Sequence, residues 1–314
     1  MSQRFTSSTQ ALIAEFSQRR PLRTGSLIVT LFGDSIAPRG GSLWLGTLIR
    51  FFDAFDISHR LVRTAVYRLV QNDILQNQAA GRRSYYSLTS GGKRQFDEAT
   101  ARIYSERAVD WSGDWCLVIT SQLDNDQRAS LRKDLLWLGF GAFGGDVLAH
   151  PTPDRILLAE HLQALNLTDR VLVFDGQLHD AQAGLSLQGL VAAAWDLIDL
   201  EVRYSGYLQQ FQPLLRATRH SALVPPEDAF YIRTLMIHEY RKIILRDPGL
   251  PSVLLPEQWP GHIAYQLTQE LYRKLAEPSE VFVSETFECS NGALPPANSE
   301  FDLRFGGLGL NLAV

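Results

Sequence analysis

One stretch of the chain, residues 58–72, places hydrogen-bonding and basic side chains opposite apolar ones. At 3.6 residues per turn, its apolar side holds Leu61, Val62, Ala65, Val66, Leu69 and Val70. Its other side holds Ser58, Arg60, Arg63, Thr64, Tyr67 and Gln71, with Arg68 at the edge. Guanidinium, amide and hydroxyl groups bond base edges and phosphates in the major groove of DNA. We therefore predict that the residues of this second side contact DNA.

The alternative for this stretch is an amphipathic helix whose polar face is simply solvated, which is the commoner case for one isolated helix. A solvated face usually mixes charges of both signs, whereas this face carries no acidic residue before Asp73. The single sign of its charge favours the DNA-binding interpretation.

A short hairpin with a basic tip follows this helix. Residues 74–78 and 83–88 are predicted to pair as two strands around the turn Ala79-Ala80-Gly81-Arg82. Arg82 and Arg83 lie at the tip, where positive charge suits a contact to the DNA backbone or the minor groove. We therefore predict that both arginines bind DNA and that the hairpin is a wing.

The elements that must position the helix at residues 58–72 and the hairpin are predicted before and after them in the sequence. Residues 26–36 and 44–55 have helical patterns separated by Gly40 and Gly41, and residues 56–58 form a tight turn with Ser58 as N-cap. Ser90 is predicted to cap a further polar helix that runs to about residue 107. This order of elements predicts a winged helix-turn-helix domain over residues 1–110.

The distribution of charge along the chain is consistent with a DNA-binding N-terminal domain. Residues 1–110 hold 15 Lys and Arg against 9 Asp and Glu, a net charge of +6, and the remainder holds 15 against 25, a net charge of −10. Neutralisation of phosphates supplies most non-specific affinity for DNA. A hydrophobic fraction of 45% predicts folded domains, and no run of about 18 apolar residues occurs. We expect a cytoplasmic protein without a membrane partner.

The N-terminal residues resemble a known family. Residues 27–103, with Ser58-His-Arg-Leu-Val-Arg-Thr-Ala-Val-Tyr-Arg-Leu-Val and Gly81-Arg-Arg-Ser-Tyr-Tyr-Ser-Leu-Thr, are similar to the winged-helix domain of the PaaX family. Its members are repressors of phenylacetic acid degradation operons. The helix-turn-helix pattern alone does not separate this family from other winged-helix regulators.

The middle of the chain has the order strand, helix, strand pair, helix, strand. These elements are predicted at residues 115–121, 125–138, 140–150, 154–165 and 170–175, and they fit a ferredoxin-like α+β domain over residues 111–180. The segment resembles the middle domain of PaaX proteins, which is similar to a small CRISPR-associated nuclease. That nuclease family uses an aspartate near the end of the first strand to hold metal, whereas Ile119-Thr120-Ser121 stands here. The resemblance therefore implies dimerisation or a scaffold.

Residues 181–285 are predicted to form a mostly helical domain, with helices at 190–211, 226–245 and 262–275 and a proline-punctuated loop at 247–261. The pattern Leu235-x-x-His238-x-Tyr240-Arg241, followed by Asp247-Pro248, Leu250-Pro251, Leu254-Leu255-Pro256 and Trp259-Pro260-Gly261, resembles the C-terminal part of PaaX repressors. The resemblance implies phenylacetyl-coenzyme A as an inducer that releases DNA. Residues 286–314 are predicted to be a loosely ordered tail.

Such a ligand requires cations near its phosphates and aromatic rings around its acyl group. The predicted ligand-binding residues are Arg233, His238, Tyr240, Arg241 and Lys242 for the first role, and Trp195, Tyr204 and Trp259 for the second. The alternative is that these residues pack the core, and for any single one this is at least as favoured. A related acyl-coenzyme A is equally compatible with the sequence.

Several short stretches match enzyme motifs only in part. Residues 139–144 match G-x-G-x-x-G, but a predicted helix precedes them where the dinucleotide motif needs a strand, and residues 184–189 are out of step with G-x-S-x-G. His238-Glu239 lacks a second histidine at position 242, and Cys116 and Cys289 have no metal-ligand spacing. We predict no catalytic residue, metal or cofactor. The chain is predicted to be a homodimeric repressor that binds an inverted repeat, and hydrolysis of nucleic acid or of a coenzyme A thioester is the alternative.

Overall fold

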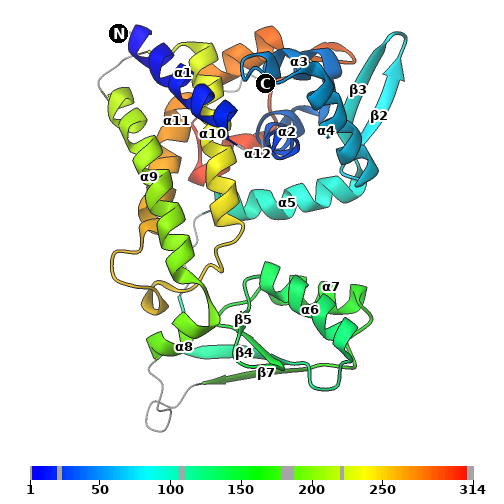
Figure 1. Ribbon diagram of the computed structural model, residues 1–314, viewed down its shortest axis with the longest axis vertical. Coiled ribbons are helices and arrows are strands. Elements are labelled where there is room, and N and C mark those ends of the chain that lie inside the picture. The colour runs from blue at the N-terminus through cyan, green and yellow to red at the C-terminus, as the bar shows by residue number, and fades with distance from the viewer. Residues whose placement is uncertain (1, 20–22, 106–109, 178–186, 220–222, 310–314) are drawn as a thin grey trace. The chain divides into compact units, whose positions relative to one another are not determined.

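The computed structural model is a mixed α+β protein and describes residues 2–19, 23–105, 110–177, 187–219 and 223–309 (Figure 1). Contacts divide the chain into two compact units. Unit 1 comprises residues 1–106, 207–242 and 264–314, and unit 2 comprises residues 107–206 and 243–263. The ranges 1–110, 111–180, 181–285 and 286–314 stay a prediction about folding domains, because compactness joins the N-terminal residues to much of the C-terminal part.

The N-terminal part of unit 1 is a set of helices followed by a three-stranded antiparallel sheet of order β1-β3-β2. Its elements are α1 (Ser2–Gln18), α2 (Thr24–Leu31), a π-helix (Phe32–Ile36), a 3-10 helix (Ala37–Arg39), β1 (Ser42–Trp44), α3 (Leu45–Asp53), α4 (His59–Gln71), β2 (Leu75–Ala80), β3 (Arg83–Leu88) and α5 (Ser90–Tyr104). The predicted hairpin is present beside α4 (Figure 1). Neither α1 nor β1 was predicted.

Local chemistry explains the turns around α4 and the hairpin. The Ser58 hydroxyl accepts the Leu61 N–H at 3.4 Å and caps α4, as predicted. Gly81 adopts a φ of +62° at the first position of the two-residue turn, a conformation that glycine enters without steric cost. The cap of α5 is Thr89, whose hydroxyl accepts the Gly92 N–H at 2.8 Å, so the prediction of Ser90 was wrong by one residue.

The C-terminal part of unit 1 packs long helices against this N-terminal part. It contains most of α10 (Pro226–Ile244), most of α11 (Pro260–Thr286), the second half of α9 (Leu197–Arg219), β8 (Glu288–Cys289), β9 (Gly292–Ala293), α12 (Ser299–Asp302) and a 3-10 helix (Arg304–Gly306). Aromatic rings join the parts: Phe51 stacks on Tyr231 at 5.6 Å between centroids, and Phe55 meets the same ring edge-on at 5.7 Å.

Two expectations for this region were wrong. Helix α11 continues past its predicted end at residue 275 because its buried positions continue to Val283. The predicted loose tail is packed as far as residue 309, since Phe301 and Phe305 are at most 1% exposed and Arg304 is bonded in the core. The glycines and prolines of the tail shape turns around these anchors.

Unit 2 is built on a four-stranded antiparallel sheet of order β5-β6-β4-β7. Its elements are β4 (Asp114–Ile119), α6 (Asn125–Trp137), β5 (Gly141–Ala142), β6 (Val147–His150), α7 (Arg155–Ala164), β7 (Leu172–Gln177), α8 (Leu187–Ala194), the start of α9, and the loop with a 3-10 helix at Ser252–Leu254. Leu131, Leu135, Leu158 and Leu162 pack on Val118 of the sheet. The predicted single helix at 190–211 is interrupted between residues 194 and 197.

The glycines of residues 139–144 serve packing in unit 2. Helix α6 precedes them and β5 follows, the reverse of a dinucleotide-binding turn. Gly139 has a φ of +95°, and a Cβ on Gly141 would lie 2.5 Å from the Trp195 ring. These glycines therefore permit a turn and the close approach of an indole.

Among the described residues, no helix combines the length and apolar character needed to cross a membrane.

Candidate nucleic-acid interface and buried polar network

Helix α4 presents the predicted polar side to solvent. It packs against α2 and α3 through Val62, Ala65, Val66 and Leu69, which are buried, while Leu61 is 40% exposed and does not join the apolar side as expected. All the predicted DNA-binding residues of this helix are exposed, namely Ser58, Arg60, Arg63, Thr64, Tyr67, Arg68 and Gln71. Tyr67 is 63% exposed, a large value for an aromatic side chain that serves no packing role.

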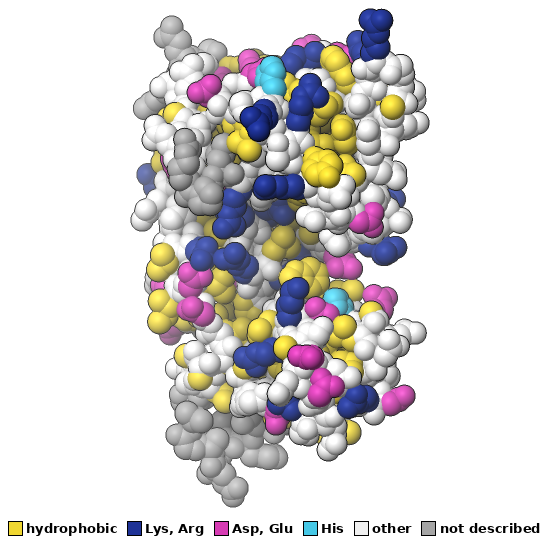
Figure 2. Space-filling view, turned by 45° about the vertical axis from the view of Figure 1, so that its right-hand side comes forward, with side chains coloured by type: hydrophobic (Ala, Val, Ile, Leu, Met, Phe, Trp, Pro, Cys, Tyr) yellow, Lys and Arg dark blue, Asp and Glu magenta, His cyan; other side chains and the backbone are white. Residues whose placement is uncertain are grey.

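The guanidinium groups of α4 are exposed side by side with the other polar groups of this helix. Within the described part of the chain, Arg60, Arg63 and Arg68 form no ion pair. The Thr64 hydroxyl donates to the Arg60 carbonyl at 2.9 Å, so its oxygen remains as an acceptor. Figure 2 brings the side of α4 and the hairpin forward, and basic side chains recur over the upper part of that face. The arrangement offers several cationic donors to a polyanion, together with hydroxyl and amide groups that can accept hydrogen bonds.

The two arginines of the hairpin differ in their surroundings. Arg82 is exposed in the two-residue turn, and no ion pair involves it in the part of the chain that the structure describes. Arg83 donates to Glu288 at 3.0 Å and lies over the Trp44 ring, 4.3 Å from its centroid. Of the two arginines, Arg82 is therefore the one that projects from the tip without an ion pair to any described residue.

The eight predicted ligand-binding residues are divided between the two units. Arg233, His238, Tyr240, Arg241 and Lys242 belong to unit 1, whereas Trp195, Tyr204 and Trp259 belong to unit 2. None of them lines either of two cavities of about 400 Å³ in unit 1. Their role as ligand contacts stays a prediction, and the observed contacts of most of them are those of packing residues.

In unit 2 the three aromatic residues are held by hydrogen bonds and ring contacts. Trp195 donates its indole N–H to the Gly139 carbonyl at 2.9 Å. Tyr204 donates to the Asp247 carboxylate at 2.6 Å, and its ring meets that of Trp259 edge-on at 5.9 Å. Each ring is at most 8% exposed, so the proline loop is fixed to the start of α9 by buried aromatic groups.

His238 anchors α10 to α2 inside unit 1. The residue is 1% exposed, and its Nδ1 lies 2.9 Å from the Thr30 hydroxyl oxygen. Thr30 donates its own proton to the Ser26 carbonyl at 3.0 Å, so Nδ1 carries a proton and donates it to Thr30. Arg241 donates to the same oxygen at 3.0 Å, while Lys242 pairs with Glu239 at 2.7 Å. The imidazole is thus a neutral donor.

A change of pH is expected to report this buried histidine. Burial, together with the charges of Lys242, Arg241 and Arg19, lowers the pKa of His238 well below its ordinary value of 6.5. Below pH 6.5 the unfolded chain therefore binds a proton that the folded chain does not. The free energy of unfolding accordingly decreases as the pH is lowered, by at most about 1.4 kcal/mol per pH unit from this group. His238→Gln should flatten the decline measured by urea denaturation at pH 7.5 and 5.5. Parallel declines in both proteins would refute this assignment.

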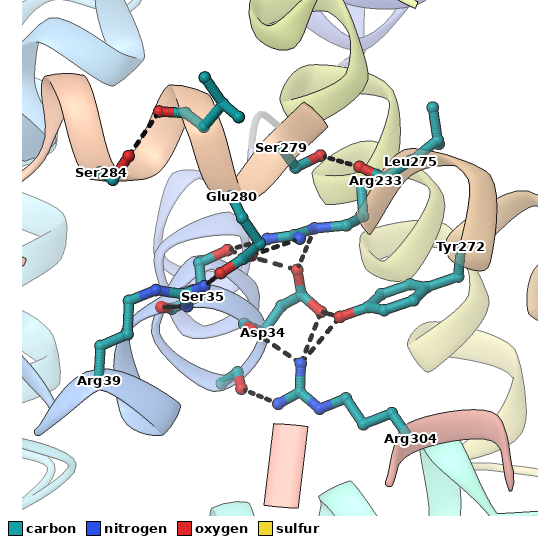
Figure 3. Close-up of polar contacts among 12 residues, drawn as sticks. Asp34, Ser35, Arg39, Arg233, Tyr272, Leu275, Ser279, Glu280, Ser284 and Arg304 are labelled. Carbon is teal, nitrogen blue, oxygen red and sulfur yellow. Dashed lines mark hydrogen bonds and ion pairs between the residues drawn. The ribbon is translucent and has the colours of Figure 1, made fainter. Parts of the chain in front are cut away.

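A buried polar network in unit 1 is centred on Asp34, in the π-helix that extends α2 (Figure 3). Asp34 is 1% exposed. Its carboxylate contacts Tyr104 Oη at 2.7 Å, Tyr272 Oη at 2.8 Å, Arg233 Nε at 3.1 Å and an Arg304 nitrogen at 3.2 Å. A single carboxylate thus joins α2, α5, α10, α11 and the C-terminal segment.

A second carboxylate, Glu280, extends the network from α11. It pairs with Arg233 at 3.0 Å and with Arg39, which also donates to the Ser35 carbonyl. Arg233 also donates to the Ser35 hydroxyl at 3.0 Å. The guanidinium predicted to face ligand phosphates is therefore fully buried and committed to protein acceptors.

The charges of the network hold one another in place. Burial alone would raise the pKa of Asp34, but the charges of Arg233 and Arg304 and two phenol hydrogen bonds lower it below its ordinary value. Burial and the neighbouring Arg233 lower the pKa of Arg39 to about 9. Three guanidinium groups thus share two carboxylates, and loss of either carboxylate leaves buried positive charge uncompensated.

Sequence reasoning identified only Arg233 of this network. Asp34 lies inside a predicted helix with an otherwise apolar buried side, and a carboxylate on such a side is the sign of a buried partner. No comparable signal marks Tyr104, Tyr272 or Arg304. Among the described residues no group of His, Cys, Asp and Glu could hold a metal ion, and both cysteines are free and buried.

Comparison with known proteins places the chain in a class of transcriptional regulators. It is 37% identical over 291 residues, 92% of each chain, to the Transcriptional repressor PaaX of Escherichia coli (strain K12). Family models match residues 23–92 (PaaX-like protein), 108–187 (PaaX protein central Cas2-like domain) and 195–285 (PaaX-like protein C-terminal domain). The chain therefore belongs to the PaaX family, and the predicted resemblance is confirmed. The relative regulates transcription, which also confirms the prediction that the chain is not an enzyme.

Among solved structures, the Uncharacterized protein Rv0674 from Mycobacterium tuberculosis is similar to this chain. The match covers 74% of this chain and 88% of that chain, with 22% sequence identity and a TM-score of 0.42.

Proposed function

We propose that this protein is a DNA-binding transcriptional repressor of phenylacetate catabolism. The observation that carries the proposal is the exposed side of α4, where Arg60, Arg63 and Arg68 lie free of carboxylates among the described residues. The printed name of the Escherichia coli relative, a transcriptional repressor, supports the same function. The protein acts in the cytoplasm, where its DNA is accessible, and needs neither a metal nor a cofactor.

In this proposal α2, α3 and α4 with the β2–β3 hairpin form a winged helix-turn-helix domain. Helix α4 enters the major groove, and Arg82 at the hairpin tip contacts the backbone or the minor groove.

The sheet of unit 2, with α6 and α7 connecting its strands in the sequence, is a ferredoxin-like domain, and its strand order β5-β6-β4-β7 supports that assignment. The protein is a homodimer whose two-fold axis matches an inverted repeat in the operator.

The effector is an aryl-acyl-coenzyme A, with phenylacetyl-coenzyme A as the favoured compound and other acyl-coenzyme A thioesters as alternatives. Binding of the effector releases the operator, so the two ligands lower each other's affinity by the same factor. Titration calorimetry with phenylacetyl-coenzyme A, free phenylacetate and coenzyme A separates the possibilities. Tight binding of free phenylacetate alone would contradict a thioester effector.

The experiment for the proposed function is a fluorescence-polarisation titration of the full chain with duplexes from the control region of phenylacetate-degradation genes, and with random duplexes of equal length. We expect preference for one duplex, typically at least about 10³-fold, and release by phenylacetyl-coenzyme A. Equal affinity for all duplexes, or turnover of DNA or thioester, would refute a repressor.

Arg82→Ala is expected to weaken binding to every duplex by a similar factor. Arg82 lies in an exposed turn and offers charge and donors to the phosphate backbone, which carries no sequence information. Loss of one phosphate contact reduces the slope of log affinity against log salt by about 1. Polarisation titrations at several salt concentrations measure the slope. A loss confined to the operator would show that Arg82 reads bases instead.

A further inference from the structure

Two guanidinium groups, an indole and a carboxylate gather beside the hairpin, and we call Trp44, Arg50, Arg83 and Glu288 the Trp44 cluster. Trp44 ends β1 and pairs with Tyr85 of β3, the strand that begins at Arg83. Arg50 comes from α3, and Glu288 comes from β8 in the C-terminal part of the chain. Arg83 thus links the cluster to the strand pair that carries Arg82 at its turn.

Both guanidinium groups are stacked on one ring. Arg50 lies 5.1 Å and Arg83 lies 4.3 Å from the centroid of Trp44. The ring itself approaches the first turn of α3 so closely that a Cβ on Gly46 would lie 2.4 Å from it. Stacking of a cation on an indole restricts the plane of the guanidinium without using its N–H donors. The Trp44 ring therefore fixes the orientation of the guanidinium groups of Arg50 and Arg83.

Glu288 uses few of these donors. One carboxylate oxygen accepts from Arg50 at 3.1 Å and the other from Arg83 at 3.0 Å, and Arg50 also donates to Thr47 at 3.2 Å. A guanidinium carries five N–H donors, so both groups keep donors for another acceptor. Side chains of Arg50 and Arg83 remain 52% and 51% exposed, and the cluster keeps one net positive charge.

An ion pair this exposed contributes little to stability. A phosphate in its place accepts bidentate hydrogen bonds from both ordered guanidiniums, a pairing that arginine makes well. We propose that Arg50 and Arg83, stacked on Trp44, bind a phosphate of the DNA backbone, and that Glu288 competes with this phosphate for them. The inference rests on the proposed DNA-binding function. Glu288 thereby restrains the affinity of the wing for DNA.

Glu288→Gln is the direct test, because it removes the competing charge and keeps the shape of the side chain. We expect it to tighten binding of the full chain to a random duplex by about 3-fold to 10-fold and to steepen the salt slope by a fraction of one phosphate contact. Glu285→Gln is the matched control: it removes an equal charge from an exposed residue three positions before Glu288, at the end of α11, and it should change affinity less. Polarisation titrations at several salt concentrations provide both quantities.

The effect of Glu288→Gln must depend on the two arginines. In an Arg50→Ala/Arg83→Ala background, which itself should bind more weakly, the same substitution is expected to leave affinity unchanged. Equal gains from Glu285→Gln and Glu288→Gln, or a loss from Glu288→Gln in a protein with wild-type thermal unfolding, overturns the inference. Failure of the wild-type chain to bind any duplex overturns the proposed function as well, whereas binding that depends on Arg63 but ignores Glu288 overturns this inference alone.

Discussion

Asp34→Ala is expected to lower the free energy of unfolding by about 3 to 5 kcal/mol, because removal of one partner from a buried ion pair leaves an uncompensated charge. Here the charges left behind are the guanidiniums of Arg233 and Arg304, and both side chains are at most 5% exposed. The hydroxyls of Tyr104 and Tyr272 lose the acceptor that lies 2.7 Å and 2.8 Å away. Urea denaturation followed by circular dichroism measures the loss.

Two further variants separate charge imbalance from a simple loss of packing. Asp34→Asn keeps the volume but not the charge, and it should also be destabilised by more than about 1 kcal/mol. Asp34→Asn combined with Arg304→Met should lose less than the sum of the two single losses, because the pair is removed together. Asp97→Ala, at an exposed carboxylate on α5, should stay within about 0.5 kcal/mol of the parent. A loss below 1 kcal/mol for Asp34→Ala would contradict the importance of the network.

The position of Asp34 connects this stability to α4, the helix that we propose binds DNA. Helix α2 packs against α4 and continues directly into the π-helix that holds Asp34. A π-helical turn inserts one residue into helical geometry and occurs often at functional positions. The carboxylate thereby fixes the platform of α4 to α10, α11 and the C-terminal segment within unit 1. Variants of Asp34 should therefore weaken DNA binding in proportion to their loss of folded protein.

Local patterns made α4 and the β2–β3 hairpin predictable. The helix α4, its Ser58 cap and the hairpin that follows are set by residues within a few positions of one another, and the structure has all three. The predicted turn at residues 79–82 was too long, because Ala79 and Ala80 pair with β3 and only Gly81 and Arg82 form the turn. Strand β1 was missed because three residues are too short for a periodic pattern, and its partner β3 lies about forty positions later. Pairing over that distance depends on tertiary packing.

The buried network was not predictable for the same reason. Asp34 and Arg304 are 270 positions apart, and no pattern in the sequence indicates that they contact each other. The glycines and prolines of the C-terminal segment suggested loose structure. Phe301 and Phe305 indicated the opposite, because large aromatic side chains gain most from burial, and both are buried. The cations of α10 suggested phosphate binding from their type alone, whereas Arg233 is paired in the core.

Arg63→Ala is expected to weaken operator binding by about 10-fold to 100-fold, the cost of one bidentate contact to a base. The expectation depends on two observations: the side chain is exposed on α4, and no carboxylate in the described residues pairs with it. Its donors are thus available without the cost of breaking an internal ion pair. The neighbouring Tyr67, which is 63% exposed, should show a smaller loss as alanine because it carries no charge.

Specificity distinguishes base recognition from general attraction. Arg94→Ala removes the same charge from an exposed position on α5 and should reduce affinity for operator and random duplexes by a similar small factor. Arg63→Ala should reduce the ratio between these affinities, because the random duplex never offered the base contact. Polarisation titrations of both variants on both duplexes at one salt concentration give the ratio. Unchanged operator affinity in the Arg63 variant would show that α4 is not the recognition helix.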